Sequence, residues 1–247
     1  MAFVRLVDYM GDDSAVVQAA RVSYGDGTKT VSDDRALVRY LMRHWHTTPF
    51  EMVDFKFHIK CPIFIARQWL RHRTASVNEI SARYSIIKND YYLPEDYRRQ
   101  TKNNKQGSDE LMDNPVLIDY SEALCEHSFV VYENLIDQGV ARELARAHLP
   151  QCTYTEFYWK INLHNLFHFL KLRMDHHAQK EIRDLAIQMY DLIKPIVPFS
   201  CEAFEDFRVN SITLTGPEIH AIVSKTRTIP GKGENIEFQE KLVKLGL

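Results

Sequence analysis

The sequence predicts an α+β fold organised as a single domain, and three observations support this. Residues 53–60, VDFKFHIK, alternate apolar and polar side chains, which is typical of a half-buried β-strand. Several longer segments repeat their apolar residues with helical spacing. The 247 residues are 45% hydrophobic, which is ample for a core, and no sharp shift in composition marks a domain boundary.

The first predicted helix covers residues 32–45, where Ser32 and two aspartates provide N-terminal signals. Its apolar residues share one helical face: Leu37, Val38, Leu41 and Trp45. The alternating strand follows, and Pro62 is expected to end it. Its apolar side consists of Val53, Phe55, Phe57 and Ile59.

A short helix is predicted over residues 63–71, and it places Gln68 and Arg71 one turn apart on a shared face. We expect a loop directly after this helix. Residues 98–115 are polar and almost devoid of apolar side chains, which predicts a surface excursion or a disordered loop. No role is assigned to that segment.

Further helices are predicted over residues 119–137, which end at Gly139, and over 141–148, which end at Pro150. Residues 162–194 form the longest periodic segment, with one continuous apolar stripe, and we expect the core helical region there. In the tail, 209–247, the pairs Gly216-Pro217 and Pro230-Gly231 are expected to break any long element.

Composition narrows the possible classes of protein. The formal net charge is −2, which argues against a nucleic-acid coat and against binding to an anionic membrane. The four cysteines, Cys61, Cys125, Cys152 and Cys201, are scattered, so we expect reduced, buried thiols. Neither a signal peptide nor an apolar run of eighteen residues is found, so we expect a soluble, cytoplasmic protein.

The segment RHRTASVNEISARYS is the densest group of chemically active side chains. It contains the triplet Arg71-His72-Arg73, the acid Glu79, and Ser81 with Arg83. Arginine holds phosphate through two parallel hydrogen bonds, and serine hydroxyls with backbone amides complete such a site. We therefore expect an anionic ligand here, the alternative being an exposed basic turn.

The same residues carry a resemblance to a known family. Arg-His-Arg, seven residues and then Ser resembles the signature of the flavin-dependent thymidylate synthases, often called ThyX; Gln68, Glu79 and Arg83 stand at the expected distances from it. The resemblance continues in HTTPFE from His46, ARxxLP from Ala145 and LRMDHHAQKEI from Leu172. It spans residues 1–210, which predicts a family domain there and a C-terminal extension of unknown role over 211–247.

The resemblance implies an α+β fold with an antiparallel sheet and a helical core. It implies an enzyme that methylates dUMP to dTMP, with methylenetetrahydrofolate as carbon donor and NADPH-reduced FAD as hydride source. It also implies a homotetramer with shared active sites. No Gly-x-Gly-x-x-Gly occurs in the chain, so side chains rather than a Rossmann fingerprint would hold the flavin.

The resemblance further implies roles for individual residues. Arg173 would contact the uracil ring and stabilise negative charge that develops on it, which makes it the catalytic candidate. The positions implied for dUMP are Gln68, Trp69, Leu70, Arg71, Glu79, Ile80, Ser81, Ala82, Arg83, Arg146 and Arg173. The positions implied for FAD are His46, Thr48, Arg71, His72, Arg73, Glu79, Asn162, Leu163, His164 and His168.

Some positions depart from the family pattern. Ala82 stands where glycine is frequent, and His164 and His168 stand where arginine and asparagine are usual. Ser81 lacks the signs of a nucleophile with a partner base, so a phosphate contact is the expected role. Without the resemblance, Arg173 has a structural explanation, a salt bridge to Asp175 or Glu181.

Two other functions remain open from the sequence. A metallohydrolase acting on a phosphorylated substrate would use His164 and His168, four residues apart on a helix, with His176 or His177, although H-E-x-x-H is missing and no metal is expected. A nucleotide or RNA binder would combine the basic triplet with stacking aromatics at Trp69, Tyr84, Tyr91 and Tyr92.

Overall fold

A computed structural model describes residues 1–23, 33–101 and 107–247, with the side chain of Asp109 left out. The chain forms two compact units, Met1–Phe204 and Glu205–Leu247. The domain boundary expected near residue 210 stays a prediction.

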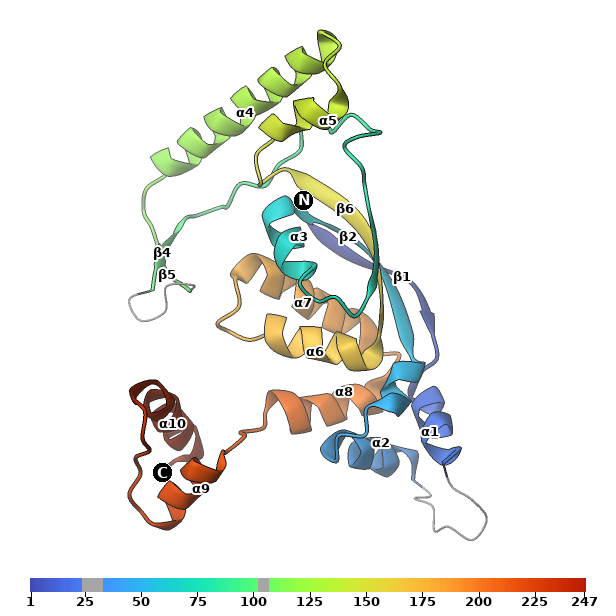
Figure 1. Cartoon of the computed structure of the whole chain (residues 1–247), viewed down its shortest axis with the longest axis vertical. Coiled ribbons are helices and arrows are strands. Elements are labelled where there is room, and N and C mark those ends of the chain that lie inside the picture. Colours follow the sequence, from blue (N-terminus) through green and yellow to red (C-terminus); the bar gives the residue numbers. More distant parts are fainter. Residues whose placement is uncertain (24–32, 102–106) are drawn as a thin grey trace. The chain divides into compact units, whose positions relative to one another are not determined.

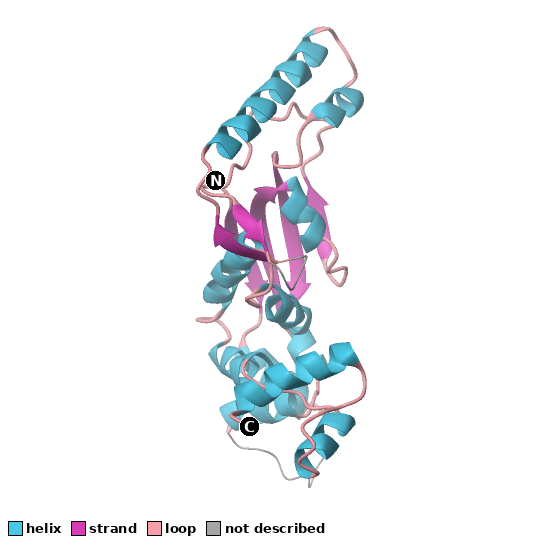
Figure 2. Ribbon diagram, turned by 90° about the vertical axis from the view of Figure 1, so that its left-hand side faces the viewer, coloured by secondary structure: helices cyan, strands magenta, loops and turns pink. Residues whose placement is uncertain are grey.

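A four-stranded sheet in the order β1-β2-β6-β3 lies at the centre of the first unit (Figures 1 and 2). All neighbouring strands are antiparallel. The strands are β1 Phe3–Met10, β2 Asp54–Pro62, β3 Ser76–Glu79 and β6 Tyr154–Asn162; a separate pair consists of β4 Arg98–Gln100 and β5 Ser108–Leu111. The α+β fold with an antiparallel sheet is therefore confirmed.

One face of the sheet is buried. Phe55, Phe57 and Ile59 of β2 have no exposed surface, and the paired Phe157 and Trp159 of β6 are each 1% exposed. The opposite face carries polar side chains. There Nε2 of His58 lies 2.9 Å from the carboxylate of Glu156, and the His58 ring stacks on Tyr158. The half-buried strand predicted at residues 53–60 is confirmed, and Pro62 is its last residue.

Helices surround the buried face and both ends of the sheet, and α4 and α5 lie beyond one end of it (Figures 1 and 2). The helices of the first unit are α1 Asp13–Arg21, α2 Asp34–Arg43, α3 Ile63–Trp69, α4 Val116–Asp137, α5 Arg142–Ala145, α6 Leu163–Arg173, α7 Lys180–Ile193 and α8 Pro198–Phe204, with the 3₁₀ turns η1 Thr48–Met52 and η2 Arg146–His148.

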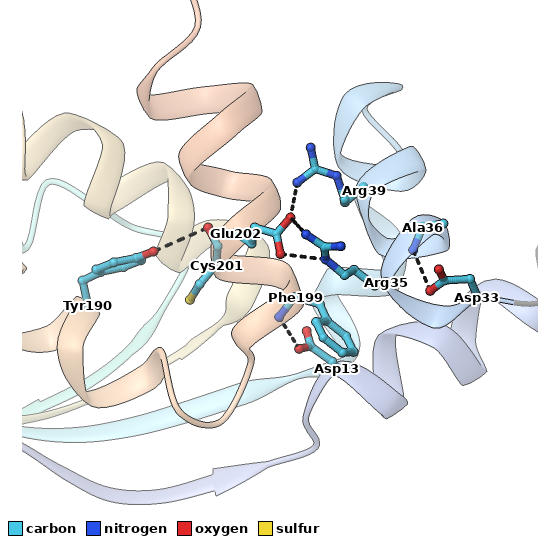
Figure 3. A network of polar contacts seen from close by, with 9 residues as sticks. All are labelled: Asp13, Asp33, Arg35, Ala36, Arg39, Tyr190, Phe199, Cys201 and Glu202. Atoms are coloured by element: carbon cyan, nitrogen blue, oxygen red, sulfur yellow. Dashed lines mark hydrogen bonds and ion pairs between the residues drawn. The ribbon is translucent and has the colours of Figure 1, made fainter.

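Buried and half-buried carboxylates join α8 to the N-terminal helices (Figure 3). Asp13 accepts hydrogen bonds from the backbone N–H groups of Phe199 and Ser200, at 2.7 and 3.0 Å, and so satisfies donors that the start of α8 leaves without helical partners. Glu202 on α8 holds Arg35 of α2 through two hydrogen bonds of 2.8 Å and also contacts Arg39.

The structure shortens several predicted helices. The helix expected over residues 32–45 runs from Asp34 to Arg43 and is capped by Asp33; Ser32 lies outside the described residues. Trp45 has φ 62°, a left-handed conformation that ends a helix. The helix expected over 63–71 ends at Trp69.

The core helical region expected over residues 162–194 is confirmed, but it is not a single helix. Two helices, α6 and α7, are separated by residues 174–179. In this gap the carboxylate of Asp175 accepts the backbone N–H of His177 at 2.9 Å, a local bond that competes with helical hydrogen bonding. The apolar stripe nevertheless belongs to the core, since Leu166, Ile182 and Met189 have no exposed surface.

Other segments also differ from expectation. The loop predicted after α3 includes β3, and part of the segment 98–115 forms β4 and β5, while residues 102–106 lie outside the described part of the chain. The expected helix 119–137 begins earlier, at Val116, and the expected helix 141–148 is α5 followed by η2.

The second unit contains a π-helical turn, Glu205–Val209, and the helices α9 Gly216–Val223 and α10 Lys232–Leu245. Its small core consists of Ala221, Phe238 and Leu242. The expected breaks are found, since α9 starts at Gly216 and Pro230-Gly231 separates α9 from α10. Gly216-Pro217 begins α9, where Thr215 and Glu218 form a capping box, and Gly233 lies within α10.

Among the helices of the described residues, none has the length and apolar character needed to span a membrane.

Candidate functional site

The candidate site lies where the C-terminal ends of α3 and α6 meet over the buried face of the sheet. α3 follows β2 and α6 follows β6, and because these strands are antiparallel the two helices start from opposite ends of the sheet. Trp69 of α3 anchors the meeting point, because its ring centroid lies 4.7 Å from that of Phe169 on α6 and 5.6 Å from that of Trp159 on β6. This packing brings Gln68, His72 and Arg173 together.

A cavity of about 960 Å³ opens at this meeting point. Three arginines, Arg71, Arg73 and Arg173, line it, and among the described residues no carboxylate does. The field in such a cavity favours an anionic ligand. The complete lining is Gln68, Arg71, His72, Arg73, Thr74, Asn165, His168, Leu172 and Arg173. The cavity therefore gathers the Arg-His-Arg triplet with Gln68, His168 and Arg173, as expected of one ligand site.

Arg173 is held by the triplet's histidine. Its Nε–H donates to Nε2 of His72 at 3.1 Å, and a terminal nitrogen lies 3.5 Å from the carbonyl oxygen of Gln68. The salt bridge considered above is not formed in the described structure, since Asp175 contacts His176 and His177 while Glu181 pairs with Arg98. Arg173 is therefore oriented by a neutral acceptor and keeps its positive charge for a ligand.

The environment fixes the protonation states of this pair. Burial, followed by the charges of Arg173 and His168, lowers the pKa of His72 to about 4, so the ring is neutral at pH 7 and accepts a hydrogen bond. Burial and the nearby Arg71 lower the pKa of Arg173. The positive charge of Arg173 is thus costly without a ligand, and an incoming anion would relieve that cost.

A second group of predicted residues lies around a turn after β3. The Ser81 hydroxyl accepts from the backbone N–H of Arg83 at 3.3 Å, and the guanidinium of Arg83 lies 3.6 Å from the carboxylate of Glu143. Arg146 donates to the carbonyl oxygen of the same Glu143 at 3.4 Å. Ser81, Arg83 and Arg146 are therefore neighbours, while the described residues place neither a histidine nor a carboxylate on the Ser81 hydroxyl.

Glu79 is part of the sheet edge. Its carboxylate accepts the Thr155 hydroxyl at 2.6 Å. Burial, with a smaller contribution from Glu79, raises the pKa of Cys61 to about 12. Ile80, which follows Glu79, donates its backbone N–H to the carbonyl oxygen of Glu156 at 2.9 Å. β3 and the turn that follows are thus fixed to β6.

A third group surrounds the start of α6. The Asn162 side chain accepts from the backbone N–H of Asn165 at 2.9 Å and so caps the helix, while Leu163 donates its backbone N–H to the Val53 carbonyl at 2.8 Å. Thr48 begins η1, which packs against α6, and the ring of His46 lies beside that of Tyr40. Leu163 and Trp69 are completely buried, so this structure exposes neither residue to a ligand.

Three lining residues were not predicted from the sequence, namely Thr74, Asn165 and Leu172. Asn165 had a signal, because it follows Asn162 by three residues and so lies on the same helical face. Thr74 and Leu172 come to the cavity only through the packing of α3 against α6.

The geometry gives little support to the two alternative functions. Among the described residues, the one cluster suited to a metal is Asp175, His176 and His177, all exposed, and it contains neither His164 nor His168. The aromatics do not form a stacking surface, since Trp69 is buried, Tyr91 packs on Phe129 and the Tyr92 hydroxyl donates to Glu181. Tyr84 alone of the four is highly exposed.

Comparison with known proteins gives a consistent result. The family model described as "Thymidylate synthase complementing protein" matches residues 5–199. The flavin-dependent thymidylate synthase of Wolbachia pipientis wMel is 54% identical over 245 residues, covering 96% of this chain and 86% of that protein. The flavin-dependent thymidylate synthase of Treponema denticola is 51% identical over 251 residues, covering 97% and 94%.

A solved structure is also similar. The crystal structure of a UMP/dUMP methylase, PolB, from Streptomyces cacaoi bound with 5-Br dUMP superimposes with a TM-score of 0.77 at 36% sequence identity. The match covers 85% of this chain and 97% of that one.

Proposed function

The chain belongs to the family of flavin-dependent thymidylate synthases, and from this premise we propose that the cavity between α3 and α6 holds uridylate beside a flavin. The protein is an enzyme of this type, and FAD is its cofactor. One observation carries the proposed location: the part of the chain that the structure describes lines the cavity with three arginines and a neutral histidine and with no carboxylate.

The substrate proposed for this cavity is dUMP, converted to dTMP with methylenetetrahydrofolate as carbon donor and NADPH as reductant. The bromo-dUMP bound in the similar methylase supports a uridylate ligand. In this proposal Ser81, Arg83 and Arg146 hold the phosphate, because hydroxyl, amide and guanidinium donors suit it. Gln68 and Arg173 face the uracil ring, and the remaining dUMP contacts are Trp69, Leu70, Arg71, Glu79, Ile80 and Ala82.

Arg173 has the catalytic role in this proposal. Its guanidinium, oriented by His72 and fixed at the end of α6, would stand beside the pyrimidine and stabilise negative charge that develops on it. The nearby Arg71 makes the isolated charge unfavourable, so binding energy is gained when an electron-rich ring arrives. None of the described residues that line the cavity is a cysteine, which fits a reaction without a protein thiol nucleophile.

The residues of the cavity also fit FAD. When bound, the flavin supplies the hydride chemistry. The guanidinium groups of Arg71 and Arg73 suit its pyrophosphate. Because Nε2 of the neutral His72 ring accepts from Arg173, its other nitrogen, Nδ1, carries the proton and can donate to the flavin. Further contacts are proposed for His46, Thr48, Glu79, Asn162, Leu163, His164 and His168; the last two residues keep donor capacity although they replace the usual arginine and asparagine.

We also propose that the active site is shared between copies of a homotetramer. Ser81, Arg83 and Arg146 gather near α5, at one end of the sheet, while the cavity lies where α3 and α6 meet (Figure 1). In the described structure no hydrogen bond joins the two groups. A single nucleotide site would therefore take its phosphate donors from one copy and its cavity from another.

Mixing two inactive variants tests this sharing. Arg83→Ala and Arg173→Ala remove one residue from each group, and each is expected to be inactive alone. Subunit exchange should restore some activity, because one kind of mixed site then carries both arginines. Sites built within one copy would stay inactive in the mixture.

The proposed activity has a direct assay. Purified protein supplied with dUMP, methylenetetrahydrofolate and NADPH should form dTMP, and omission of any one should stop it. The protein should also carry stoichiometric FAD. A colourless preparation whose phosphatase activity disappears with a chelator would instead favour the metallohydrolase. We further propose that residues 1–210 form the catalytic domain, that 211–247 are an extension, and that the enzyme works in the cytoplasm.

A further inference from the structure

Gln179 lies immediately before α7 and contacts Gln68, a residue predicted to bind dUMP. Gln68 donates its Nε2–H to Oε1 of Gln179, so the two amides, 111 residues apart in sequence, meet at the cavity. Gln179 itself does not line the cavity. Its side chain thus reaches a ligand only through Gln68.

Two residues further on, Glu181 anchors this end of α7. Its carboxylate forms an ion pair with Arg98 of β4 at 2.6 Å and accepts a hydrogen bond from the Tyr92 hydroxyl at 3.0 Å. The side chain of Glu181 is only 11% exposed. Although burial raises it, hydrogen bonding from Arg98 brings the pKa of Glu181 below its ordinary value, so the group is charged at pH 7. The first turn of α7 is therefore tied to β4.

The backbone of Gln179 follows from this anchorage. Its φ and ψ of −54° and 134° are extended, and the chain turns into helix at Lys180. With Glu181 fixed from outside the helix, the Gln179 side chain is presented to Gln68 from a rigid position. An amide held on one side keeps its carbonyl oxygen and its second N–H for a ligand.

We propose that Gln179 is a positioning residue that orients the Gln68 amide for the nucleotide, and that the Arg98–Glu181 pair fixes Gln179 for this purpose. The inference rests on the proposed function of the cavity. It also assigns a role to strand β4, which lies in the segment 98–115 to which the sequence assigned none. The inference predicts energetic coupling between the two residues: replacing Gln179 should weaken dUMP binding only while Gln68 is present.

A double-mutant cycle tests this with the FAD-loaded enzyme. The variants are Gln179→Leu, Gln68→Ala and both together, and the readout is the dissociation constant of dUMP from the change in flavin absorbance. Loss of one neutral hydrogen bond predicts that Gln179→Leu weakens binding about three- to tenfold. In the Gln68→Ala background the same replacement should change binding less than about twofold, because interacting residues are not additive.

Gln188→Leu is the matched control, since it makes the same change at an exposed position of α7 and should leave binding unaltered. If Gln179→Leu lowers the melting temperature, Gln179→Met, which keeps the side-chain length, takes its place. Equal weakening in both backgrounds, or none in either, overturns the inference. An unmodified enzyme whose flavin never responds to dUMP would instead refute the proposed function, and the inference with it.

Discussion

Replacing Arg173 by Met should lower turnover by about 10²- to 10³-fold while leaving the fold nearly as stable as before. Methionine keeps an unbranched apolar stem but removes the guanidinium and its charge. The lost interactions are the hydrogen bond to His72, worth about 1 kcal/mol, and the favourable placement of a cation at the C-terminus of α6, worth about 0.5 kcal/mol.

Opposing gains nearly cancel these losses. The variant no longer buries a guanidinium and no longer suffers repulsion from Arg71, the two causes that lower the pKa of Arg173. We therefore expect the free energy of unfolding to change by less than about 1 kcal/mol. Urea denaturation of both proteins measures it.

The effect on activity should be far larger. Loss of a charge that stabilises the transition state typically costs about 10²- to 10³-fold in turnover, so dTMP formation at saturating substrates should fall by that factor. Flavin content should stay near normal. Turnover within threefold of the unmodified enzyme would refute the catalytic role, and a loss of stability above about 3 kcal/mol would show that Arg173 is chiefly structural.

Three further predictions follow from buried groups. The pKa of His72 is about 4 in the folded protein and about 6.5 in the unfolded chain, so the unfolded chain binds an extra proton and the free energy of unfolding should fall between pH 7 and pH 5. After allowance for solvent screening, urea titrations should show a loss about 1 kcal/mol larger than in His72→Gln. Equal losses in the two proteins would contradict this. Burial raises the pKa values of Cys61 and Cys125 to about 12, so iodoacetamide at pH 8 should label neither thiol in the native protein and both in the unfolded protein. Mass spectrometry of peptides measures the labelling, and fast labelling of Cys61 in the native protein would argue against its burial. Asp13→Ala removes the acceptor for the first N–H groups of α8 and should lower the free energy of unfolding by about 2–4 kcal/mol; a change under 1 kcal/mol would mean that water replaces the carboxylate.

The parts of the fold that the sequence predicted are those in which one face is buried. β2 alternates because Phe55 and Phe57 face the core while Lys56 and His58 do not. β3 has no such signal, since all four of its residues are exposed and it is defined only by its pairing with β6. β6 does alternate, with Phe157, Trp159 and Ile161 buried, so that strand was predictable and was overlooked.

The site divides in the same way. The Arg-His-Arg triplet was visible because its residues are adjacent in sequence and their charge has no ordinary structural use. The break between α6 and α7 depends on a side-chain bond at Asp175, which periodicity does not reveal. The contact of Arg173 with His72 joins residues 101 positions apart, and only the packing of Trp69 on Phe169 creates it.

The most direct test of the account is a crystal structure of the enzyme with both FAD and dUMP. The account predicts a uracil ring within hydrogen-bond reach of the Arg173 guanidinium and a flavin in contact with Arg71 to Arg73. It also predicts that a neighbouring copy supplies the residues that bind the phosphate of dUMP, namely Ser81, Arg83 and Arg146. An occupied nucleotide site elsewhere, with Arg83 and Arg173 both directed into solvent, would contradict it.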